Sequence, residues 1–212
     1  MNTLVLISLN HDPLGPMGET HVGGQAKYAL EVSKNLSLKG WKIALFTVTQ
    51  LGLPEKEDIS DNCILYRIPR ENSDTYNYDM NESEAKDLGD KIILRLATEC
   101  ITPELVYGCF WLSGIAGSQV SHFFSIPLVF TFCQLGTFVI QEEELASQNY
   151  QLPKASLLDR IAAERKVCTN ASAIIATNRD ELNSIVRDYD ISRHKVHFIP
   201  RGVDLQRFFL ND

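Results

Sequence analysis

Short runs of β-branched and other apolar residues alternate along this chain with longer stretches of helical periodicity. The apolar runs lie at residues 3–9, 42–48, 62–69, 104–108, 127–132, 172–177 and 195–200. The stretches with helical periodicity lie near residues 26–36, 82–100, 111–124, 155–170 and 179–189. Such alternation is typical of a parallel sheet covered by helices on both faces. It predicts an α/β fold: a Rossmann-like, doubly wound, mainly parallel sheet of about seven strands.

Length, charge and cysteine usage narrow the class of protein. A chain of 212 residues fits one large α/β domain. The net charge of −7, without a cluster of Lys and Arg, argues against binding nucleic acid. No apolar run approaches the ~20 residues of a transmembrane segment, and the N-terminus lacks signal-peptide features. The five cysteines form no C-x-x-C pair, which favours reduced thiols, mostly as buried apolar residues. We therefore expect a cytoplasmic protein without a transmembrane segment.

The loop after the first strand has an unusual glycine pair. In a sheet of this kind the ligand lies beyond the carboxyl ends of the strands. Gly23 and Gly24 stand there, directly before the first expected helix. Free backbone N–H groups at a helix start attract a phosphate, and no side chain would block its approach. The alternative is a helix cap with flexible glycines. NAD is disfavoured because the long loop contains no G-x-G-x-x-G.

Five segments together resemble a known family. They are HVGGQAKYALEVSKNLSLKGWKIALFT, PELVYGCFWLSGIAG, IPLVFTFCQLG, RIAAERKVCTNASAIIATNRDEL and HKVHFIPRGVDLQRF. They resemble the acceptor domains of the retaining glycosyltransferases of family 4, in the branch of the sucrose-phosphate synthases and D-inositol-3-phosphate glycosyltransferases. The resemblance runs nearly end to end.

The resemblance implies a GT-B architecture of two Rossmann-like domains. Residues 1–205 would be the N-terminal, acceptor-side domain, and residues 206–212 the start of a linker to a donor domain that this sequence lacks. Members of the family use a nucleotide-sugar donor, held mainly by the second domain, and generally require no metal. The implied partners are a donor-binding domain or subunit and a sugar or sugar-phosphate acceptor.

The resemblance also implies ligand-binding residues. Gly23 and Gly24 match glycines that approach phosphates in the cleft, and Gln25 matches a position that contacts a phosphorylated acceptor. Arg160 lies where the branch often keeps a basic residue near the acceptor phosphate. The alternative for Arg160 is a surface arginine paired with Glu164 four residues later.

Several positions depart from the family pattern at its polar residues. Where relatives have histidines at the ends of two central strands, this chain has Tyr107, Cys109, Phe130 and Cys133, and Phe110 stands where they have a tyrosine. Losing a positioned polar group at a reacting centre typically costs about 10²- to 10⁴-fold in rate. We therefore assign no catalytic residue, and Cys133 stands at one of the family's histidine positions.

Three further residues are expected to line the cleft. His21 stands where relatives have an aspartate, Gln134 follows Cys133, and Trp111 could stack on a sugar or simply pack at a helix start. Two minor hypotheses remain for this region. His11, His21 and Cys133 have zinc-ligand chemistry without a recognised metal spacing, and Cys133 beside a histidine has the parts of a nucleophile.

Two functional classes follow. The chain is either the acceptor-binding half of a glycosyltransferase, active only with a donor domain, or a catalytically inactive, stand-alone GT-B half that binds a ligand or a protein. The retained glycines and Gln25 favour the first class, and the missing histidines favour the second. Nothing in the sequence identifies the sugar donor or the acceptor.

Overall fold

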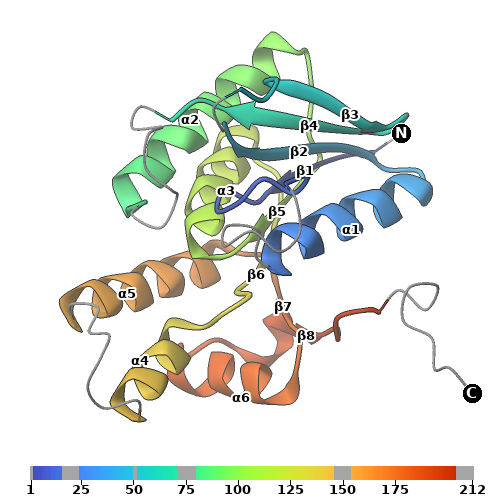
Figure 1. Cartoon of the computed structure of the whole chain (residues 1–212). Coiled ribbons are helices and arrows are strands. Elements are labelled where there is room, and N and C mark those ends of the chain that lie inside the picture. Colours follow the sequence, from blue (N-terminus) through green and yellow to red (C-terminus); the bar gives the residue numbers. More distant parts are fainter. Residues whose placement is uncertain (1, 16–23, 50–51, 71–79, 146–153, 204–212) are drawn as a thin grey trace, which may run out of the picture.

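An eight-stranded sheet forms the centre of the molecule. The computed structural model describes residues 2–15, 24–49, 52–70, 80–145 and 154–203, and Figure 1 shows the whole chain. The strand order is β3-β4-β2-β1-β5-β6-β7-β8. The strands are β1 Thr3–Ile7, β2 Lys42–Val48, β3 Lys56–Ser60, β4 Cys63–Ile68, β5 Leu105–Cys109, β6 Leu128–Thr131, β7 Ala173–Ala176 and β8 Val196–Phe198.

Parallel pairing dominates the sheet. Every neighbouring pair is parallel except β3 and β4, which form an antiparallel hairpin. The α/β, Rossmann-like prediction is confirmed, and the seven predicted runs correspond to β1, β2 and β4 to β8. The additional strand is β3 at the sheet edge. Its sequence, KEDIS, alternates between exposed and half-buried residues and contains three charges, so it lacks the apolar run of a buried strand.

Helices fill the connections between the strands. They are α1 Gly24–Leu38, α2 Glu82–Thr98, α3 Trp111–Phe124, α4 Gly136–Leu145, α5 Lys154–Asn170 and α6 Arg179–Asp188, with a 3₁₀ turn at Arg193–Lys195. The helix α4, which contains the QEEE stretch at 141–144, lies outside the predicted stretches of helical periodicity. The other five helices lie where the apolar periodicity predicts them.

The helices cover the two faces of the sheet as separate layers. Figure 1 shows α1 on one face and α2 and α3 packed side by side on the other. Because side chains alternate along a strand, β1 sends Leu4 and Leu6 toward α1, and Val5 and Ile7 toward α2 and α3. All four side chains are buried. A parallel strand buried on both faces explains why TLVLI is apolar throughout.

Close packing at β5 sets the position of α3. A Cβ atom on Gly108 would lie 3.1 Å from the Cα atom of Gly114 on α3, so both glycines allow the helix to approach the strand. Between them Phe110 adopts a φ of 81°, a left-handed conformation that is rare for an aromatic residue. This tight connection brings the start of α3 to the carboxyl end of β5.

Candidate functional site

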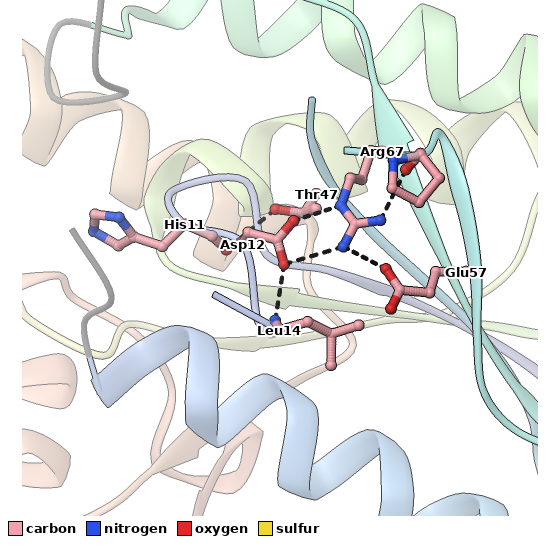
Figure 2. A network of polar contacts seen from close by, with 7 residues as sticks. His11, Asp12, Leu14, Thr47, Glu57 and Arg67 are labelled. Carbon is pink, nitrogen blue, oxygen red and sulfur yellow. Dashed lines mark hydrogen bonds and ion pairs between the residues drawn. The ribbon is translucent and has the colours of Figure 1, made fainter. Parts of the chain in front are cut away.

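A buried ion-pair network fixes the start of the loop after β1 (Figure 2). Arg67 on β4 donates to both carboxylate oxygens of Asp12, and the two side chains are 1% and 0% exposed. Asp12 also accepts a hydrogen bond from the backbone N–H of Leu14 at 2.8 Å. Thr47 on β2 donates to the backbone carbonyl of His11 at 3.2 Å. These bonds tie the loop to two neighbouring strands, while Figure 2 shows the His11 ring pointing away from Arg67.

The edge hairpin completes this network. The Arg67 Nη2 atom, which also donates to Asp12, lies 2.8 Å from a carboxylate oxygen of Glu57 on β3. The Nη1 atom donates to the backbone carbonyl of Pro54 at 2.8 Å. Burial lowers the pKa of Arg67, but its hydrogen bonds to Asp12 and Glu57 outweigh that effect and raise the pKa overall. Arg67 therefore keeps its charge, and that charge is balanced within the protein.

The first turn of α1 lies against the ends of the central strands. Gln25 donates from Nε2 to the backbone carbonyl of Cys109, the last residue of β5, at 3.0 Å. Lys27 donates to the carbonyls of Pro13 and Gly15 in the loop after β1, at 3.2 and 3.4 Å. Among the residues that the structure describes, none would lie within 4 Å of a Cβ atom on Gly24, so a side chain added there meets no described neighbour.

A tyrosine pair continues this contact one turn further along α1. The hydroxyl groups of Tyr28 and Tyr107 lie 2.8 Å apart, which joins α1 to β5. Burial raises the pKa of both hydroxyls, so both stay protonated near neutral pH. Tyr107 stands at a position where relatives have a polar residue, and its hydroxyl is hydrogen-bonded to that of Tyr28.

Cys133 lies just beyond the end of β6 in a strained conformation. Its φ is 62°, a left-handed value that costs a non-glycine residue about 1–3 kcal/mol. Burial raises the pKa of the Cys133 thiol to about 12, and the nearby Arg201 opposes that rise. A thiol with this pKa is almost entirely protonated at neutral pH, whereas a catalytic thiolate needs a lowered pKa. The structure thus argues against Cys133 as a nucleophile.

Arg160 on α5 contacts the loop between β6 and α4, which contains Cys133. Its Nε atom donates to Glu164 at 2.8 Å, and its Nη2 atom donates to the backbone carbonyl of Gln134 at 2.7 Å. The guanidinium also lies over the ring of Phe110, 5.0 Å from the ring centroid. Glu164 is fully buried, and burial raises its pKa against the opposing effect of Arg160. The pairing expected as the alternative for Arg160 is present, although only 12% of the arginine side chain is exposed.

Glu164 connects three helices. Besides Arg160 on its own helix, it accepts hydrogen bonds from the hydroxyl of Tyr189, after α6, and from the backbone N–H of Gly136, the first residue of α4. A buried carboxylate needs such partners because its desolvation is costly. The bonds hold α4 and the loop between β6 and α4 against α5.

The remaining predicted site residues fall into separate environments. The side chain of Gln134 is exposed near Arg160. Trp111 is half-buried at the start of α3, with its ring 6.3 Å from that of Phe110, which fits packing. Phe130 is fully buried beside Phe132. Its ring belongs to the core between β6 and α3.

Two predicted residues, His21 and Gly23, lie outside the described residues, as does the proposed linker at 206–212. The sequence analysis missed Arg201, whose guanidinium lies 5.3 Å from the ring centroid of Tyr28. Its signal was present in IPRGVD, which directly follows the last strand. Among the cysteines, Cys100 is exposed, so the expectation of burial is wrong there.

Within the described residues, no group of three or more His, Cys, Asp or Glu side chains is arranged to hold a metal ion. Among the helices described, none combines the length and apolar character needed to cross a bilayer.

Sequence comparisons identify relatives over almost all of the chain. The model of the family described as Glycosyltransferase Family 4 matches residues 22–207. A mannosylfructose-phosphate synthase from Agrobacterium fabrum is 24% identical over 198 residues, which is 92% of this chain and 43% of the relative. A D-inositol 3-phosphate glycosyltransferase from Nocardiopsis dassonvillei is 26% identical over 95% of this chain and 46% of its own length. The chain thus spans about half the length of the curated relatives it matches.

Solved structures share the same fold. A sucrose-phosphate synthase from Thermosynechococcus elongatus superimposes with a TM-score of 0.83 at 23% identity, covering 99% of this chain and 50% of that protein. An Anabaena protein solved in complex with UDP and glucose gives a TM-score of 0.61 at 10% identity, covering 97% of this chain and 46% of that protein. At these identities the likeness establishes the fold and leaves the ligands open.

Proposed function

The chain belongs to glycosyltransferase family 4, and on that premise we propose that it is the acceptor-binding half of a glycosyltransferase. The proposed reaction transfers a sugar from a nucleotide sugar to a sugar or sugar-phosphate acceptor, with retention of anomeric configuration. Residues 1–205 form the acceptor-side domain in this proposal, and residues 206–212 begin the linker to a donor-binding domain. The proposed location is the cytoplasm.

One contact carries the proposal. Gln25 on α1 reaches across to the Cys109 carbonyl at 3.0 Å, so the retained glycine-glutamine motif lies over the end of the central strand β5. Ligands of doubly wound sheets bind at this edge. Gly24 is the first residue of α1, and the free backbone N–H groups of a first helical turn form the positive end of the helix dipole, which favours a phosphate. Motif and geometry therefore support one binding site.

A surface at the last strand supports the need for a second domain. Phe198, Ile199 and Val203 are exposed large apolar residues within six positions of one another, at and after β8. Exposed apolar side chains that gather in this way mark interaction surfaces more often than scattered ones do. The relatives are about twice as long as this chain, which leaves room for a donor domain to follow this segment.

Complementation with a donor domain tests the proposal. The chain is co-expressed with, or joined to, the C-terminal half of the mannosylfructose-phosphate synthase named above. Release of nucleoside diphosphate is then measured with UDP-glucose, ADP-glucose or GDP-mannose and with fructose 6-phosphate or inositol phosphate. We expect release only when both halves are present. Gln25→Ala should reduce it, whereas Gln119→Ala, which removes a contact between α3 and Asp90 on α2, should not. Absence of transfer from every donor would contradict the proposal.

The second candidate is a catalytically inactive module that binds a ligand or a protein. It is favoured by Cys133, which occupies the family histidine position with a protonated thiol. Cys133→His separates the two candidates. A gain in transfer rate with the donor domain supplied supports the enzyme, and unchanged ligand affinity without any transfer supports the binding module. Phe130→His is unsuitable because it would place an imidazole in the apolar core.

A further inference from the structure

The arginines at the carboxyl ends of the strands differ in whether their charge is balanced. Three are paired with carboxylates: Arg67 with Asp12, Arg70 with Glu84, and Arg160 with Glu164. In each pair the arginine side chain is at least 88% buried, and it joins a strand-end loop or helix to a neighbour. These three arginines therefore have structural roles in ion pairs within the protein. The charge of Arg160 in particular is balanced by Glu164, which weakens it as the residue for an incoming phosphate.

Arg201 is placed differently. It follows β8, and its guanidinium lies over the ring of Tyr28 on α1, 5.3 Å from the centroid. Across the described ranges, from residue 2 to residue 203 with their gaps, Arg201 makes no ion pair with a carboxylate. When a guanidinium stacks on an aromatic ring, its N–H bonds lie in the guanidinium plane and point away from the ring. They can therefore still donate hydrogen bonds to a ligand. The ring thus holds the cation in place without using its hydrogen bonds.

The neighbours of Arg201 place it at the centre of the site. Tyr28 lies one turn after Gln25 on α1, and Gln25 contacts the end of β5. The positive charge of Arg201 also lowers the pKa values of the Cys109 and Cys133 thiols against the larger effect of burial. Both thiols lie at the ends of central strands. Arg201 therefore lies beside Tyr28 of α1 and within electrostatic reach of the ends of β5 and β6.

We propose that Arg201 binds a phosphate group of the ligand in this site, opposite the open start of α1. The inference rests on the proposed function and adds the residue that reads the anionic group. An arginine fork matches phosphate oxygens in two-point geometry, and such charge-assisted hydrogen bonds are stronger than neutral ones. The phosphate belongs either to a phosphorylated acceptor or to the diphosphate of a nucleotide sugar. Both present the same oxygen chemistry to Arg201.

Arg179 provides a matched control. It begins α6 after β7, it stacks on the ring of Phe198 at 5.8 Å, and it makes no ion pair within the part of the chain described here. Arg179 thus resembles Arg201 in exposure, in its aromatic partner and in its unbalanced charge. It differs in lying toward α6 and away from α1. A nonspecific attraction of anions would depend on both arginines, whereas a specific site depends on Arg201.

Binding of phosphate compounds by titration calorimetry tests the inference. The probes are inorganic pyrophosphate, UDP and fructose 6-phosphate, each titrated into the wild-type chain and into Arg201→Gln, Arg201→Lys and Arg179→Gln. We expect R201Q to weaken binding about tenfold or more, R201K to weaken it less, and R179Q to leave it unchanged. An effect confined to fructose 6-phosphate assigns the acceptor phosphate, and one confined to UDP and pyrophosphate assigns the donor diphosphate.

Two outcomes would overturn the inference. They are equal affinity of R201Q and wild type, and failure of all three probes to bind the wild type. Thermal unfolding without ligand checks the fold of each variant. If R201Q does not fold, Tyr28→Leu replaces it, because loss of the ring should also weaken phosphate binding. Transfer in the complementation experiment, with R201Q as active as the wild type, would leave the proposed function standing and remove only the role of Arg201.

Discussion

Arg160 and Glu164 lie one turn apart on α5, and the Arg160 Nε atom is 2.8 Å from a carboxylate oxygen of Glu164. The carboxylate is completely buried, while the same arginine reaches the backbone carbonyl of Gln134 beside Cys133. One side chain thus balances a buried charge and holds the strained loop after β6. Because it makes both contacts, Arg160 positions the loop after β6 in the candidate site.

Removing Arg160 should therefore destabilise the fold. Arg160→Met keeps the aliphatic stem but leaves Glu164 buried without its cation. Breaking one side of a buried pair costs about 3–5 kcal/mol, and we expect the lower end because 12% of the arginine side chain is exposed. Arg187→Met, which breaks an exposed pair with Asp188, should have a much smaller effect because water already solvates and screens that pair. Urea unfolding measures both, and equal costs would contradict the positioning role.

The buried carboxyl also predicts a pH dependence of stability. Burial raises the pKa of Glu164 above its ordinary value of 4.5, so the folded chain holds this proton more tightly than the unfolded chain. Its contribution to the free energy of unfolding is complete below pH 4.5 and falls as the pH rises through the folded pKa. The difference in free energy of unfolding between wild type and Glu164→Gln should therefore decrease over that interval. A difference that grows with pH would exclude this account.

The fold could be predicted from sequence because the signals are local. TLVLI and KIALFTV are apolar runs that suit strands buried on both faces, and the intervening periodicity marks α1. The strand β3 was missed because an exposed, charged edge strand has no such run. The pairing of β3 depends on β4 and on the contact between Arg67 and Glu57. These two residues lie too far apart in the sequence for a local pattern to link them.

The candidate site was predictable only in part. Gly24 and Gln25 belong to a continuous motif, and Gln25 contacts the Cys109 carbonyl at the end of β5, while the ligand-binding role of both residues stays a prediction. By contrast, the position of Arg201 depends on the distance between the end of β8 and α1 in space. The sequence separates Tyr28 and Arg201 by almost the whole chain. Contacts of this kind follow from strand order, which periodicity does not reveal.

The thiol of Cys133 should react slowly with alkylating reagents. Its pKa of about 12 leaves little thiolate at pH 8, and alkylation requires the thiolate. Arg201→Gln should slow the reaction further because Arg201 favours the charged form. Exposed Cys100 serves as the internal reference. Mass-spectrometric peptide mapping after iodoacetamide treatment measures both rates, and rapid modification of Cys133 relative to Cys100 would contradict the assigned environment.

Substitution by alanine should destabilise the fold at one helical glycine, Gly114, and leave stability almost unchanged at another, Gly24. A Cβ atom on Gly114 would lie 2.7 Å from the ring of Phe130 and 2.7 Å from Val167, both buried. Overpacking of this kind costs about 1–3 kcal/mol, which outweighs the higher helix propensity of alanine. Gly24→Ala has open space and should change stability by less than about 0.5 kcal/mol. In the proposed site, however, its methyl group should weaken phosphate binding. Thermal unfolding of the two variants measures the effect on stability, and titration calorimetry measures the effect on phosphate binding.

The two acids that contact Arg67 provide the last comparison. The Asp12 side chain is 0% exposed and holds the loop after β1, whereas that of Glu57 is 41% exposed on the edge strand. Asp12→Asn keeps the shape but removes the buried charge, so it should cost about 3 kcal/mol. Glu57→Gln should cost under about 1 kcal/mol because water already screens that contact. The loop held by Asp12 leads from β1 toward α1, so Asp12→Asn should also weaken phosphate binding in a fraction that remains folded. Urea unfolding and calorimetry measure the two effects, and equal behaviour of the two variants would show that the loop does not depend on the buried pair.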